Sequence, residues 1–142
     1  MAHEDVLASV PLFSQLKRTD LARLAKAVVS RKHAAGEMVV TEGDQAAGFF
    51  IITKGRVEVV KGLKGEKPQQ LAVLGPGEFF GEMALLDGYL RSTSVRALED
   101  AEFLVLTRWD FMAELQESPH IALSMLTVLS RRLRETEALL HD

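Results

Sequence analysis

The residues best suited to chemistry lie between Phe79 and Val95. Gly81 is followed at once by Glu82, and Arg91 and Ser92 come near the end of this stretch. A guanidinium and a hydroxyl suit an anion, and the planar fork of arginine can hold a phosphate through parallel hydrogen bonds. A carboxylate needs a donor instead, such as a sugar hydroxyl. The combination therefore fits an anion with a neighbouring hydroxyl, as a ribose phosphate presents.

The backbone after Gly81 offers a second set of anion-binding groups. Residues 82–86 leave room for only a short helix before Asp87-Gly88. The first amides of such a helix have no internal partner, and with the helix dipole they favour an anion. Gly81 has no side chain, so the backbone can approach a ligand closely there. The amides expected at this site belong to Glu82, Met83, Ala84 and Leu85.

The elements that must position this stretch are short strands. All 10 glycines lie between Gly36 and Gly88, and they separate runs rich in Val, Ile, Phe and Thr. These runs are residues 38–41, 49–53, 56–61, 70–74, 92–97 and 103–107. Several short strands separated by turn residues predict a sandwich or a barrel.

Helices are expected on both sides of the strands. Leu21, Leu24, Ala25 and Val28 recur at helical spacing, which predicts a helix that begins near Thr19-Asp20 and ends near Ser30. Glycine is absent after residue 108. A short helix is predicted over 109–116, with the lone tryptophan, Trp109, packed at the hinge. Ser118-Pro119 then begins a long helix that reaches about Leu140.

The long helix carries an apolar stripe. Its members follow alternating steps of three and four: Leu126, Leu129, Leu133, Thr136 and Leu140. We interpret the stripe as a core-facing surface. The same spacing is that of a coiled-coil seam of about two heptads, so a homodimer through the C-terminal helix remains the alternative.

Composition limits the classes of function. The chain has 142 residues, no cysteine and a net charge of −3. The four histidines are far apart, so no metal site is expected, and no nucleophile paired with a base suggests an enzyme. The acidic balance argues against direct binding of nucleic acid. Neither a signal peptide nor an apolar run long enough to span a membrane is present, which predicts a cytoplasmic protein without membrane contact.

At this point a resemblance to a known family is plain. Phe80-Gly81-Glu82-Met83-Ala84-Leu85-Leu86 and Arg91-Ser92-Thr93-Ser94-Val95 resemble the phosphate-binding cassette of the cyclic-nucleotide-binding family. Gly43-Asp44, 49–52 and 55–57 resemble that family's first barrel strands. Leu90 departs from the pattern, because many members have proline there.

The resemblance implies a role for each matching position. Arg91 would pair with the cyclic phosphate, and Glu82 would accept the ribose 2′-hydroxyl. The amides of 82–85 and the Ser92 hydroxyl would complete the phosphate site, with Thr93 beside them. In the last helix, Arg132 and Thr136 match a pattern of the family's catabolite activator, which implies contact with the base.

The resemblance also implies the ligand and the fold. Ser92 directly after the arginine favours cyclic AMP and leaves cyclic GMP open, and no cofactor is expected. The fold expected is mainly β, an eight-stranded jelly-roll-like barrel with N-terminal helices, a short cassette helix and a long C-terminal helix. The whole chain, 1–142, would be one domain, with helices over 1–30, the barrel over 31–107, the cassette over 79–95 and helices over 108–142.

The function predicted is that of a sensor, not an enzyme, whose C-terminal helices change position when the nucleotide binds and act on an unidentified protein effector. Two alternatives remain open. The chain could be a fragment of a cyclic-AMP-responsive transcription factor, channel or kinase regulator, although it ends at Asp142, where a helix-turn-helix domain would begin. It could also be a dimerising scaffold that has lost its ligand.

Overall fold

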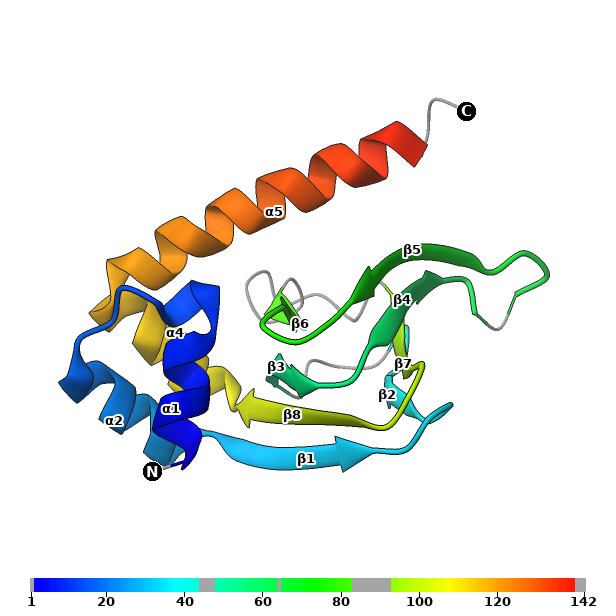
Figure 1. Ribbon diagram of the computed structural model, residues 1–142. Coiled ribbons are helices and arrows are strands. Elements are labelled where there is room, and N and C mark those ends of the chain that lie inside the picture. The colour runs from blue at the N-terminus through cyan, green and yellow to red at the C-terminus, as the bar shows by residue number, and fades with distance from the viewer. Residues whose placement is uncertain (1, 44–47, 64, 83–92, 140–142) are drawn as a thin grey trace.

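The computed structural model describes residues 2–43, 48–63, 65–82 and 93–139 (Figure 1). Its helices are α1 (Ala2–Ser9), the 3₁₀ helix η1 (Pro11–Phe13), α2 (Arg18–Ala27), α4 (Arg108–Glu117) and α5 (Pro119–Leu139). Its strands are β1 (Val29–His33), β2 (Met38–Val40), β3 (Phe49–Lys54), β4 (Val57–Lys61), β5 (Gln69–Leu74), β6 (Phe79–Phe80), β7 (Ser94–Ala97) and β8 (Ala101–Leu106).

Within the described residues, the strands form two antiparallel sheets of four strands each. Sheet A has the order β1-β8-β3-β6, and sheet B has the order β2-β7-β4-β5. The helices gather at one end, except that α5 extends back across sheet B (Figure 1). This arrangement confirms the mainly-β, jelly-roll-like fold with flanking helices. The expected cassette helix lies outside the described residues.

Sheet A separates two hydrophobic cores, because successive side chains of a strand point to opposite faces. Between the sheets, Phe50 and Phe80 stack with their ring centroids 4.8 Å apart. On the helix side, Phe49 stacks on Phe111 of α4 with centroids 4.5 Å apart, and Phe79 packs beside them. The adjacent phenylalanines of β3 and β6 thus contribute to both cores at once.

A partly buried ion pair joins the N-terminal and C-terminal helices. Arg23 of α2 donates two hydrogen bonds, of 2.8 and 3.1 Å, to the buried carboxylate of Glu114 on α4. The bond to Glu114 is the main reason that the pKa of Arg23 lies above its usual value. Because both oxygens of Glu114 are engaged, the two helices have a fixed relative orientation.

The first strand differs from the sequence prediction. The helix expected to reach Ser30 ends at Ala27, and Val29–His33 form β1, which pairs with β8 from Val29↔Val105 to His33↔Ala101. β1 is almost wholly exposed, so it carries no alternation that would reveal a strand. Its conformation is set by pairing with β8, which overrides local propensity. The helix also begins earlier than expected, after Lys17, which makes no side-chain cap.

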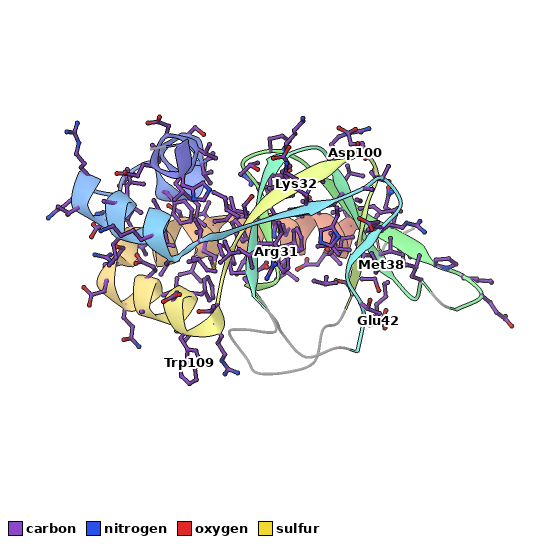
Figure 2. All side chains as sticks on the ribbon, turned by 90° about the horizontal axis from the view of Figure 1, so that it is seen from below. Arg31, Lys32, Met38, Glu42, Asp100 and Trp109 are labelled. Atoms are coloured by element: carbon purple, nitrogen blue, oxygen red, sulfur yellow. The ribbon has the colours of Figure 1, made fainter. Side chains whose placement is uncertain are left out.

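Two predictions about buried side chains are wrong. Trp109 is 83% exposed and projects from the start of α4, as Figure 2 shows, so it does not pack at the hinge. Leu126 and Leu133 are each 60% exposed, so they do not face the core. The predicted stripe is displaced from the buried face of α5, on which Ile121 and Met125 lie.

No described helix is long and apolar enough to cross a lipid bilayer. The domain boundaries drawn from the sequence stay a prediction.

Candidate functional site

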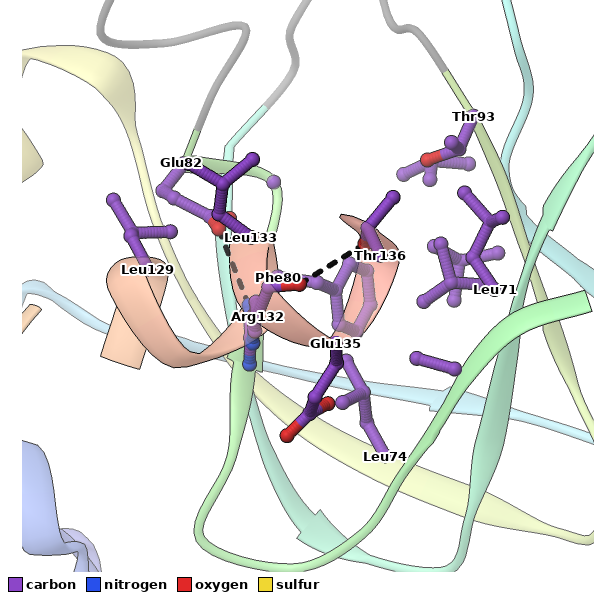
Figure 3. Close-up of a pocket in the computed structure, with 15 residues that line it drawn as sticks. Leu71, Leu74, Phe80, Glu82, Thr93, Leu129, Arg132, Leu133, Glu135 and Thr136 are labelled. Carbon is purple, nitrogen blue, oxygen red and sulfur yellow. Dashed lines mark hydrogen bonds and ion pairs between the residues drawn. The ribbon is translucent and has the colours of Figure 1, made fainter. Parts of the chain in front are cut away.

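A cavity of ≈ 470 Å³ lies between sheet B and α5 (Figure 3). Its volume is in the range of small-molecule sites. The walls are mostly apolar: Val40, Val59, Leu71, Ala72, Leu74, Phe80, Val95, Leu129 and Leu133. The polar lining residues are Glu82, Thr93, Arg132, Glu135 and Thr136. An apolar chamber with a few polar groups is suited to a ligand that has both a flat apolar part and a hydrogen-bonding part.

Glu82 owes its place to strand β6. Phe80 pairs with Phe50 of β3, so the end of β6 is anchored between the two cores. Gly81 follows with a φ of 95°, a left-handed conformation that favours glycine, and turns the chain toward the cavity. Glu82 is consequently only 4% exposed. A carboxylate removed from water to this degree must be compensated by charge or hydrogen bonds.

Arg132 of α5 supplies part of that compensation. Its Nη1 lies 3.2 Å from Oε1 of Glu82, and its Nη2 donates a 2.6 Å hydrogen bond to the carbonyl oxygen of Phe79. The guanidinium also lies over the Phe79 ring, 4.5 Å from the centroid. One side chain of α5 is therefore bonded to the end of β6.

Thr136 lies one turn further along α5, on the same side as Arg132. Its hydroxyl donates a 3.0 Å hydrogen bond to the carbonyl oxygen of Arg132, and both residues line the cavity (Figure 3). Their spacing of four residues places them on one helix face, as the sequence predicts.

Part of the predicted site comes together around this cavity. Gly81, Glu82, Thr93, Arg132 and Thr136 all line it. Five other predicted positions lie outside the described residues: Met83, Ala84, Leu85, Arg91 and Ser92. The ligand contacts assigned to all ten therefore stay predictions.

Sequence reasoning missed two features of the cavity. It did not foresee that Glu82 and Arg132 form an ion pair, because residues so distant in sequence give no signal beyond opposite charge. It also did not single out Glu135, an exposed residue of α5 that lines the cavity. The apolar walls were predicted only as strands, since a strand pattern does not distinguish a cavity wall from a packed core.

Two carboxylates outside the cavity have depressed pKa values for structural reasons. Glu58 on β4 accepts hydrogen bonds from Gln70 and Arg96, which lower its pKa. Glu42 accepts from the amide of Gly62 and pairs with Lys61, and these contacts lower its pKa as well. Neither residue lines the cavity, so we assign both to the stability of sheet B.

No group of three or more metal-binding side chains occurs in the described parts of the chain. The cavity offers hydrogen bonds, charge and apolar surface.

The fold and cavity define a ligand-binding β-barrel module. The profile of the cyclic nucleotide-binding domain matches residues 30–118. The chain belongs to this family.

Relatives of several kinds share the domain. The cyclic AMP receptor protein of Thermus thermophilus is 35% identical over 127 residues, which are 89% of this chain and 59% of that protein. The cyclic nucleotide-gated potassium channel RHE_CH03180 of Rhizobium etli is 36% identical over 128 residues, 89% of this chain and 34% of the channel. The chain thus spans less than two thirds of the length of these relatives.

Solved structures agree with the fold. The crystal structure of the Thermus thermophilus catabolite activator protein superposes with a TM-score of 0.80 at 35% identity, over 92% of this chain and 62% of that one. The family is one of regulatory ligand-binding domains.

Proposed function

We propose that the chain is a cyclic-nucleotide sensor module, with cyclic AMP as its first-choice ligand, and that it has no catalytic activity of its own. The observation that carries the proposal is the largely apolar cavity with the buried carboxylate of Glu82 in its lining. The walls can enclose a purine, and the carboxylate can accept a hydrogen bond from a ribose hydroxyl.

The phosphate end of the site rests on the sequence. Arg91, Ser92 and the amides of 82–85 match the family's cassette, and Arg91 would pair with the cyclic phosphate. The names of the relatives support cyclic AMP, since one is a cyclic AMP receptor protein. A relative named as a cyclic-GMP-dependent kinase, 32% identical over 111 residues, keeps cyclic GMP as the second ligand to test.

The experiment is calorimetric titration of the purified chain with cyclic AMP and, separately, cyclic GMP. We expect cyclic AMP to bind with the higher affinity. Arg91→Ala should weaken binding by about 2–5 kcal/mol, because a buried phosphate would lose its charged partner. The matched control is Arg131→Ala, which removes an exposed arginine of α5. Absence of binding to the folded chain at high micromolar concentrations would reject the proposal.

Ligand binding would act on the effector protein through α4 and α5, which flank the barrel. The ligand can shift them only if it binds one of their arrangements more tightly than the other. Sequence outside this cavity determines on which protein the module acts. It also determines whether the chain is part of a larger regulator or channel. We propose a cytoplasmic location and no direct contact with nucleic acid.

A homodimer through α5 is a second part of the proposal. Leu123, Leu126 and Leu133 are each 60% exposed, which is unusual for three leucines on one helix. A second copy of the helix would bury them. Sedimentation equilibrium should therefore give a dimer, and Leu123→Ser with Leu126→Ser, at two positions that do not line the cavity, should give a monomer that still binds nucleotide.

A further inference from the structure

Strand β1 forms one edge of sheet A, because the strands of this sheet have the order β1-β8-β3-β6. Its neighbour among the described strands is β8, and the pairing runs from Val29↔Val105 to His33↔Ala101. In the view from below, β1 lies in front of the other strands, and no described helix or strand covers it (Figure 2). Within the described part of the chain, the outer side of β1 is therefore a free sheet edge.

The peptide groups along this edge have unused capacity for hydrogen bonds. In an antiparallel pair, alternate residues of an edge strand direct their N–H and C=O groups away from the neighbouring strand. Apart from the ladder with β8, the peptide groups of residues 29–33 form no hydrogen bond with other described residues. An added strand would use these donors and acceptors together, whereas a phosphate backbone has only acceptors to offer.

The side chains of β1 add positive charge to the edge. Arg31 and Lys32 are exposed, and neither forms an ion pair with another described residue. Glu102 lies opposite Lys32 in the ladder, but its carboxylate lies 3.8 Å from the ammonium group of Lys54. Other cations of the barrel have carboxylate partners as well: Arg56, Lys61 and Arg96. The charge of the β1 edge therefore suits an acidic partner.

The same charges argue against a second copy of this chain on the edge. Two β1 strands paired with each other would bring the cations of both copies together, and like charges on adjacent strands are destabilising. Cations on an edge strand often prevent such pairing. A segment with carboxylates opposite Arg31 and Lys32 would instead be attracted.

The start of β1 adds apolar surface. Val29 is 48% exposed, and it lies opposite Val105 near the end of β8. A few residues after Val105 the chain begins α4, where Trp109 is 83% exposed. Val29 and Trp109 are thus exposed at the same end of β1, and exposed aromatic side chains are enriched at protein interfaces.

We propose that the free edge of β1 is a docking site for an extended acidic segment of a partner protein, which pairs with β1 as an added antiparallel strand of sheet A. The register defines the segment, because directly opposite side chains of adjacent strands share a face. Two consecutive carboxylates lie opposite Lys32 and Arg31, and an apolar residue two positions later lies opposite Val29. None of residues 29–33 lines the cavity, so the docking site is separate from it.

The probe is a short fluorescent peptide that contains the sequence Thr-Glu-Glu-Thr-Val-Thr, and fluorescence anisotropy measures its binding to the chain. A second peptide has lysine in place of both glutamates. Two further peptides carry N-methyl groups on alternate residues, one at the odd positions and one at the even positions. Because alternate amides of a strand point to opposite edges, only one of these two patterns blocks pairing with β1.

The protein variants reverse charge at two exposed positions at a time. Arg31→Glu with Lys32→Glu changes the β1 edge. The matched control is Lys67→Glu with Arg134→Glu, which makes the same change of charge in the connection between β4 and β5 and on α5. Arg31→Gln with Lys32→Gln removes the charge without reversing it, and covers the case in which the double reversal does not fold.

We expect the acidic peptide to bind the unchanged chain and the control variant with affinities that agree within about twofold. Reversal of Arg31 and Lys32 should weaken its binding by about tenfold or more, and the lysine peptide should then bind better than the acidic one. One of the two N-methylated peptides should lose binding, and the other should keep it. On binding, amide hydrogen exchange should slow in residues 29–33 and not in β5, an edge strand of sheet B.

Absence of binding between the acidic peptide and the folded, unchanged chain would overturn the docking site and leave Arg31 and Lys32 as cations that protect the edge from pairing. Equal weakening in the two double reversals, or equal effects of the two N-methylation patterns, would also overturn it, because general attraction between charges would then account for binding. Slowed exchange at a segment other than 29–33 would place the peptide elsewhere and refute the proposal. Displacement of the peptide by a single-stranded oligonucleotide would favour a nucleic acid as the occupant and refute it too.

Discussion

Glu82 offers the sharpest test of how the cavity would recognise a sugar. The perturbation is Glu82→Gln, which keeps the size of the side chain but removes its charge. It is combined with a change in the ligand, from cyclic AMP to its 2′-deoxy analogue. If Glu82 accepts the 2′-hydroxyl, the two changes remove the same hydrogen bond, and their effects should not add.

The magnitude follows from the burial of Glu82. A hydrogen bond to a charged group contributes about 1.5–3 kcal/mol, and a neutral one about 0.5–1.5 kcal/mol. Glu82 is 4% exposed, which favours the upper part of the first range, but Arg132 already shares its charge. We therefore expect loss of the hydroxyl to weaken binding by about 2 kcal/mol, or roughly 30-fold, in the unchanged chain. In Glu82→Gln the same loss should be about 1 kcal/mol.

The assay is calorimetric titration of both proteins with both ligands, after urea unfolding has shown that Glu82→Gln remains folded. The difference between the two losses, about 1 kcal/mol, is the coupling between the carboxylate and the hydroxyl. A coupling of zero, with both proteins folded and both ligands bound, would refute the assignment of Glu82 as the ribose acceptor. Binding would then depend on the apolar walls and on the proposed phosphate contacts.

Three further predictions concern stability. Phe111→Ala should lower the free energy of urea unfolding by about 3–5 kcal/mol, because removal of the buried ring stacked on Phe49 leaves a cavity. A decrease below about 1 kcal/mol would mean that α4 repacks. Gly55→Ala should lower the melting temperature clearly more than Gly36→Ala. Both glycines have a left-handed φ, but a Cβ at Gly55 would collide with the backbone of Asp100 and Ala101, whereas a Cβ at Gly36 would meet nothing within 4 Å. Equal decreases in melting temperature would contradict this prediction. The pKa of Glu58 in the folded chain is depressed below its ordinary value of 4.5. The ionised carboxylate therefore stabilises the fold fully above pH 4.5, and this stabilisation is lost as the pH falls through the folded pKa. Glu58→Gln should accordingly flatten the acid limb of a pH–stability curve, and an unchanged limb would show that other carboxylates control acid unfolding.

Much of the fold could be predicted from local pattern, where burial leaves a signature. The runs that became β3, β4 and β8 are rich in Val, Ile and Phe because most of their side chains are buried, and their predicted bounds agree to within two residues. β1 could not be found in this way. Its exposed Ser30, Arg31 and Lys32 carry no such signature, and pairing with β8 alone makes it a strand.

The candidate site also has residues that the sequence predicts and contacts that it does not predict. Gly81 and Glu82 could be found because they are contiguous with a motif, and Thr136 because its spacing from Arg132 places both on one helix face. The partnership of Arg132 with Glu82 could not be found, since it depends on how α5 crosses the barrel. Trp109 shows the opposite error: a large aromatic residue suggested burial, yet nothing in its immediate sequence shows which side of α4 faces outward.

Sheet A, which lies between the two hydrophobic cores, has a consequence for unfolding. Phe49 and Phe50 are consecutive residues that pack into different cores, and so are Phe79 and Phe80. Neither core can loosen without disturbing a backbone that the other also needs. The helical end and the barrel should therefore melt together, in a single transition with equal van't Hoff and calorimetric enthalpies.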